Sequence, residues 1–108
     1  MKIIVLKFGG TSVGSIQRIS KVANIIKSYS KKYKVIVLAS AMSGTTNKLI
    51  NMSQKISKNF PDHEYDTLVS AGEQISCSLL SGQLLTKGLK SRSLMAWQIP
   101  ILTEGKHK

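Results

Sequence analysis

A strand that runs into a glycine-rich loop constrains the fold of this chain more than any other feature. The apolar run 3–6 is followed by Lys7-Phe8-Gly9-Gly10-Thr11-Ser12-Val13-Gly14, and Ser15 then begins a segment of helical period. This order predicts a strand, a tight loop and a helix N-terminus. Glycines let backbone N–H groups approach an anion closely, the helix end adds partial positive charge, and Lys7 adds a full charge. The loop therefore fits a phosphate site, although a turn that only reverses the chain has the same signature.

Length and composition limit the class of protein. A chain of 108 residues forms one domain at most. No apolar run approaches the ~20 residues of a membrane span, and the four apolar residues after Lys2 are too few for a secretory signal. The chain is therefore expected to have no membrane partner. Because Cys77 is the only cysteine, no intrachain disulfide can form, which fits a reducing, cytoplasmic setting.

The charge of the chain is strongly positive, with a formal net value of +11. Arg18 and Arg92 are the only arginines among 16 basic residues, and the lysines are scattered along the sequence. A nucleic-acid-binding protein more often clusters arginine with stacking aromatic residues. We therefore expect no nucleic-acid partner, but the charge should attract anions such as nucleotides over long range.

Hydrophobic periodicity predicts an α/β fold with a mainly parallel sheet. The continuous apolar runs are typical of parallel strands covered on both faces, which implies a three-layer αβα sandwich. On the longest predicted helix, small residues (Ser76, Ser78, Ser81 and Gly82) permit close packing, and Gly88 is a natural C-terminal cap. The predicted elements are a strand over 2–7, a helix over 15–30, a strand over 35–39, a helix near 46–56, a short helix over 65–70, a long helix over 73–87 and a weaker strand over 93–96, which Pro100 would end.

A second loop of small hydroxyl residues follows the second predicted strand. It reads Ser40-Ala41-Met42-Ser43-Gly44-Thr45-Thr46-Asn47 and runs into a helix. In open parallel sheets, ligands bind beyond the carboxyl ends of the strands, so we expect the two loops to converge. Glu73 follows an expected turn at 70–72 and begins the long helix, where its carboxylate either caps the helix or binds a cationic group.

These segments closely resemble aspartate kinases, which belong to the amino-acid kinase family. The glycine loop resembles the opening motif of that family, the 40–50 segment its second signature, and Ser70-Ala71-Gly72-Glu73-Gln74 its third. Trp97-Gln98 and Ile101-Leu102-Thr103 also fit the stretch that follows in family members. The resemblance runs from about residue 2 to residue 104 in the family order.

The resemblance implies a role for each matching residue. Lys7, as the catalytic charge, would hold the transferring phosphate of MgATP together with Phe8, Gly9, Gly10, Thr11 and Ser12. Ser40, Thr46 and Glu73 would hold L-aspartate, with Glu73 accepting from its ammonium group. The implied reaction moves the γ-phosphoryl of ATP to the side-chain carboxylate of aspartate, in the synthesis of lysine, threonine and methionine.

The resemblance also implies what the chain does not contain. Family members are several times longer, so residues 1–108 match an N-terminal segment of the catalytic domain without the nucleotide-base half or the regulatory ACT domains. The expectation is an inactive piece that needs a complementing chain or a homo-oligomer. The alternative is a non-catalytic remnant, or an interaction module that binds anions.

The remaining chemically active side chains have structural interpretations. Cys77 is interpreted as a small apolar group on the long helix, and Trp97 is interpreted as a packing residue. Two unpaired histidines, His63 and His107, together with one cysteine do not make a metal site, and Asp62 and Asp66 are not assigned to one. Thr11 and Ser12 either bind phosphate or cap the helix that follows.

Overall fold

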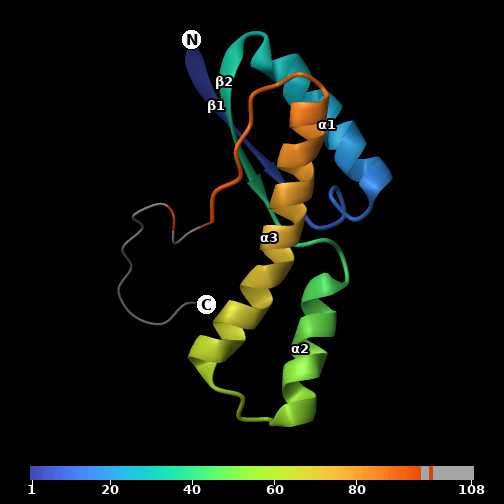
Figure 1. Ribbon diagram of the computed structural model, residues 1–108, viewed down its shortest axis with the longest axis vertical. Coiled ribbons are helices and arrows are strands. Elements are labelled where there is room, and N and C mark those ends of the chain that lie inside the picture. Colours follow the sequence, from blue (N-terminus) through green and yellow to red (C-terminus); the bar gives the residue numbers. More distant parts are fainter. Residues whose placement is uncertain (96–97, 99–108) are drawn as a thin grey trace.

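The computed structural model describes residues 1–95 and Gln98, and shows two strands and three helices in them. Expectations for Ala96, Trp97, Pro100, His107 and residues 101–103 lie outside the described residues. The elements are β1 (Lys2–Phe8), α1 (Ile16–Ser30), β2 (Tyr33–Ala39), α2 (Thr45–Ile56) and α3 (Asp62–Thr86), as Figure 1 shows.

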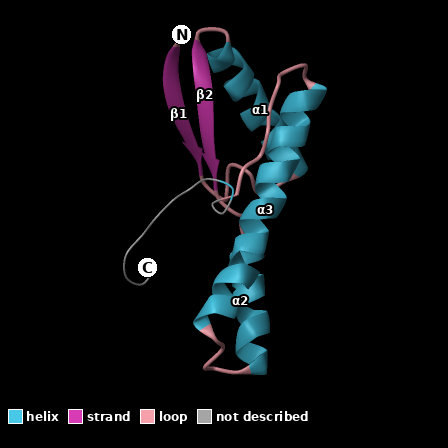
Figure 2. Ribbon diagram, turned by 60° about the vertical axis from the view of Figure 1, so that its left-hand side comes forward, coloured by secondary structure: helices cyan, strands magenta, loops and turns pink. Residues whose placement is uncertain are grey.

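The two strands form the parallel sheet that the sequence predicts. β1 pairs with β2 in a register that runs from Lys2 opposite Tyr33 to Phe8 opposite Ala39, and α1 connects them. Both helices that contact the sheet, α1 and α3, lie on one side of it (Figure 2). The α/β class with parallel strands is therefore confirmed, and in the described residues the helices cover one sheet face.

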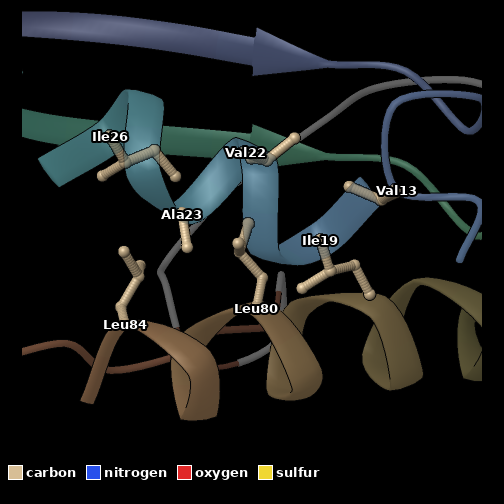
Figure 3. Close-up of a cluster of buried hydrophobic side chains, with 7 residues drawn as sticks. All are labelled: Val13, Ile19, Val22, Ala23, Ile26, Leu80 and Leu84. Carbon is tan, nitrogen blue, oxygen red and sulfur yellow. The ribbon is translucent and has the colours of Figure 1, made fainter. Parts of the chain in front are cut away.

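The core lies between this sheet face and the two helices. Ser15 caps α1 by accepting a hydrogen bond from the Arg18 amide at 3.2 Å, which starts the helix where the sequence predicts. The buried stripe of α1 then meets apolar side chains of α3 (Figure 3). The buried cluster consists of Val13, Ile19, Val22, Ala23, Ile26, Leu80 and Leu84. Leu6, Phe8, Val35 and Val37 pack against it from the strands.

One expectation for the helices was wrong. Residues 65–70 and 73–87 were predicted as two helices with a turn between them, but α3 runs without a break from Asp62 to Thr86. Glycine costs a helix only about 1 kcal/mol, and packing outweighs that cost here. A Cβ on Gly72 would lie 3.0 Å from the Ala41 Cβ and 3.2 Å from the Thr45 Cγ2. Gly72 therefore serves close packing of α3 against the second loop.

The third expected strand is not formed in the described residues. Residues 93–95 are not a strand, and the backbone of Met95 bonds to Gln98 instead: its amide donates to the Gln98 side chain at 2.7 Å, and its carbonyl accepts from the Gln98 amide at 2.9 Å. α2 forms near the expected residues 46–56, but Ser53 is its only buried residue, and Met52 and Ile56 are exposed. Among the elements of the described chain, α2 packs mainly against α3.

Candidate functional site

The two loops after the strands meet at one edge of the sheet, as the sequence predicts. The Ser40 amide donates to the Phe8 carbonyl at 3.2 Å, which extends the pairing one residue beyond the strands. The Ser43 amide donates to the Gly10 carbonyl at 3.1 Å, so the loops are bonded to each other. This contact requires Gly10, because a Cβ there would lie 2.7 Å from the Ala41 carbonyl oxygen.

The first loop presents backbone donors beside a lysine. Val13 and Gly14 use their amides within the loop, donating to Gly9 at 3.3 Å and to Thr11 at 3.2 Å. Among the described residues, no protein group accepts from the amides of Gly10, Thr11 or Ser12. The Lys7 side chain is exposed at the end of β1. Unpaired N–H groups beside a cationic side chain are the chemistry that binds an anion.

The helix that follows this loop has its own cap. Since Ser15 accepts the Arg18 amide, the interpretation of Thr11 and Ser12 as helix caps was wrong. Both side chains are exposed. Arg18 reaches back instead, and its Nη1 donates to the Thr11 carbonyl at 3.3 Å, which ties α1 to the loop.

The third motif faces the second loop from α3. Glu73 is exposed in the interior of α3, so the interpretation of Glu73 as a cap at a helix N-terminus was wrong. One turn further along, Ser76 is fully buried and donates its hydroxyl to the Ser40 carbonyl at 2.6 Å. Ala41 lies between Gly10 on one side and Gly72 on the other, and is itself buried. The three motifs thus assemble around Ala41.

Comparison with known proteins adds a second kind of evidence. The model of the amino acid kinase family matches residues 2–108. The chain belongs to the amino acid kinase family. It is 50% identical to the aspartokinase of Geobacillus stearothermophilus over 108 residues, 99% of this chain and 26% of that protein. It is 45% identical to the aspartokinase of Rickettsia felis over 111 residues, 99% of this chain and 28% of that protein.

A solved structure of this family agrees with the fold. The crystal structure of aspartate kinase from Synechocystis superposes with a TM-score of 0.76 at 43% identity, over 81% of this chain and 15% of that chain. The chain spans about a quarter of the length of the curated relatives it matches. The α/β arrangement described above is therefore the arrangement found in an aspartate kinase.

The remaining predicted site residues, Ser40 and Thr46, also lie near the joined loops. Ser40 is half-buried directly after β2, and Thr46 is half-buried in the first turn of α2. α2 begins after Gly44, whose φ of +86° favours glycine. Sequence reasoning did not assign Gly72 and Ser76 to the site. The small residues on the long helix did indicate a close contact with another segment. Their pattern does not identify the loop that makes this contact.

The described residues contain a cavity that is not at these loops. It has a volume of about 440 Å³ and lies between β2, the C-terminal half of α3 and residues 89–94. Cys77 lines it, and burial, followed by the negative charge of Glu73, raises the pKa of the Cys77 thiol. A raised pKa keeps the sulfur as a weakly nucleophilic thiol at neutral pH, which agrees with a packing role.

Two classes of feature are not found in the described part of the chain. No three His, Cys, Asp or Glu side chains there gather closely enough to hold a metal ion. No helix in that part is long and apolar enough to cross a membrane.

Proposed function

We propose that this chain carries the phosphate-binding and acceptor-binding loops of an aspartate kinase. The enzyme would transfer the γ-phosphoryl group of ATP to the side-chain carboxylate of L-aspartate, in the synthesis of lysine, threonine and methionine. One observation carries the proposal: the hydrogen bond from the Ser43 amide to the Gly10 carbonyl joins the two motif loops at the end of the sheet. The names of the relatives support the same substrate pair.

The first loop would bind the phosphates. Phosphoryl transfer depends mainly on neutralising charge and aligning the reactants. Lys7 would contact the transferring phosphoryl group, and the loop Phe8-Gly9-Gly10-Thr11-Ser12 would surround the phosphate chain with N–H and hydroxyl groups. Fixed donors of this kind stabilise the charge that develops in the transition state.

The second loop and α3 would bind the acceptor. Ser40 and Thr46 would donate hydrogen bonds to aspartate, and Glu73 would accept from its ammonium group. The acceptor carboxylate is already ionised at pH 7, so the reaction needs no general base from the protein. Holding this carboxylate in line with the phosphorus atom is then the main task of the site.

Mg²⁺ would accompany ATP, where it neutralises phosphate charge. In such sites it is bound through substrate phosphates, waters and one or two carboxylates. The described residues offer no cluster of three ligands for it. We assign no metal ligand in this chain, and each role above rests on protein groups alone.

The proposal places residues 1–108 as an N-terminal segment of the catalytic domain, working in the cytoplasm with ATP and L-aspartate. Its test is a chimera in which this chain replaces the corresponding 26% of the Geobacillus stearothermophilus relative. Hydroxylamine traps the aspartyl phosphate product. We expect aspartate-dependent product, and Lys7→Ala should lower kcat about 10²–10³-fold, the usual effect of losing one oxyanion donor.

Lys34→Ala is the matched control for Lys7→Ala. Lys34 is exposed on β2, on the same sheet face as Lys7 but four residues nearer the start of the paired strands. The control should keep the kcat of the unsubstituted chimera. Equal losses in both variants would point to net charge rather than to the loop, and the assignment of Lys7 would be wrong.

A further inference from the structure

We propose that Ser76 is a positioning residue that sets the second loop against the helix that carries Glu73. The proposal rests on the proposed function only where it concerns aspartate. Its structural part stands on the contacts between α3 and residues 40–45. These contacts join the two groups of acceptor-binding residues, through a hydrogen bond between residues 36 positions apart in the sequence.

The hydroxyl of Ser76 has two acceptors within reach. It lies 2.6 Å from the Ser40 carbonyl oxygen and 3.1 Å from the Glu73 carbonyl oxygen. A helical serine ordinarily bonds back to its own helix, as the longer contact does. The contact to Ser40 is the shorter, so the single hydroxyl proton favours the bond between elements. The bond ends on Ser40, one of the residues proposed to hold aspartate.

The surroundings of Ser76 shield its side of the bond from water. Ser76 has no exposed surface, and Ala41, next to its acceptor, is only 7% exposed. A part-buried carbonyl that loses its donor must find another partner or shift toward water. Without the Ser76 hydroxyl, the loop at Ser40 should therefore move.

Gly72 fixes the distance of the same contact. Gly72 and Ser76 are four residues apart and share one face of α3. A Cβ on Gly72 would lie only 3.0 Å from the Ala41 Cβ, so the absence of a side chain there permits the close approach. Glu73 lies between them in sequence, so its place relative to Ser40 is set by one hydrogen bond and one close contact.

Hydrogen exchange on this chain tests the structural part. In Ser76→Ala, the amides of Ser40, Ser43 and Thr45 should exchange about tenfold faster, while amides in β1 and β2 keep their protection. Ser81→Ala is the matched control, because Ser81 is a buried serine on the same helix whose hydroxyl bonds to Ser91 instead. It should leave exchange at residues 40–45 unchanged.

Kinetics of the chimera test the functional part. Ser76→Ala should raise KM for aspartate about tenfold or more with little change in KM for ATP, since small displacements of positioning groups are costly. Ser76→Thr keeps the hydroxyl and should recover most of the loss. Ser81→Ala should leave both constants unchanged.

The outcomes separate the two proposals. Unchanged exchange at residues 40–45 would overturn the role of Ser76, as would faster exchange spread evenly over β1, β2 and the loop, which marks general destabilisation. Equal increases in KM for aspartate and for ATP would also overturn it. A chimera that makes no aspartyl phosphate, with faster exchange confined to residues 40–45, would refute the aspartate kinase function while supporting Ser76 as the residue that positions the loop.

Discussion

Glu73 is the residue whose interpretation changed most between sequence and structure. Glu73 lies in the interior of α3 and therefore cannot cap the helix N-terminus. Its exposed carboxylate lies one turn before Ser76, which donates a hydrogen bond to the acceptor-binding loop. In the chimera, Glu73→Gln should raise KM for aspartate about tenfold and leave KM for ATP nearly unchanged, because a charge-assisted hydrogen bond contributes about 1.5 kcal/mol or more. Steady-state kinetics with each substrate varied in turn measure both constants.

Glu64→Gln is the control for this prediction at the residue scale. Glu64 is an exposed carboxylate in the first turn of the same helix, 3.5 Å from His63, and belongs to no motif. Its substitution should change neither constant. If Glu73→Gln behaves like Glu64→Gln, Glu73 is an ordinary solvated side chain.

At the scale of elements, α3 owes its length to packing rather than to local preference. Its two glycines give a matched comparison, because a Cβ on Gly82 meets nothing within 4 Å, whereas one on Gly72 meets Ala41 and Thr45. Gly82→Ala should raise the free energy of unfolding by about 1 kcal/mol, the difference in helix preference. Gly72→Ala gains the same helix preference but overpacks the second loop. Its free energy of unfolding should therefore be about 1–3 kcal/mol lower than that of Gly82→Ala.

Urea unfolding of this chain, followed by circular dichroism, measures both changes. Similar stabilisation in the two variants would mean that the second loop moves to accommodate the added methyl group at little energetic cost. The close contact at Gly72 would then have no energetic consequence, and the unbroken α3 would need another explanation.

At the scale of the whole molecule, the sheet is the unusual feature. Burial alternates along both strands, and Ile3, Val5, Ile36 and Leu38 share the more exposed face of the sheet, where they are between 48% and 63% exposed. Apolar patches of this kind recruit other chains. We expect this chain to self-associate through that face, and more strongly at high salt, because salt screens the repulsion from a net charge of +11. Sedimentation velocity at several protein and salt concentrations tests this.

The variant Val5→Thr/Ile36→Thr should shift the chain toward monomer, since these two residues are directly paired at the centre of the face. Leu85→Thr is the control, because Leu85 is 54% exposed but lies on α3, away from the sheet. Association that falls equally in both variants, or that weakens as salt is added, would rule out the sheet face as the main contact.

The parts of this protein that could be predicted from its sequence are those that local interactions govern. Apolar runs that end in glycine and hydroxyl residues predict strands that lead into ligand loops, and Ser15 and Gly88 mark helix ends through their own backbone and side-chain chemistry. Convergence of the two loops also followed, because parallel strands place their carboxyl ends at one edge. Features that depend on residues distant in the sequence could not be predicted in this way. Gly72 breaks a helix by local preference but stays helical where Ala41 and Thr45 pack against it, and Ser76 finds its acceptor 36 residues away. Residues 93–95 have the pattern of a strand, but a strand needs a ladder of partners, and the Met95 backbone bonds to Gln98 instead.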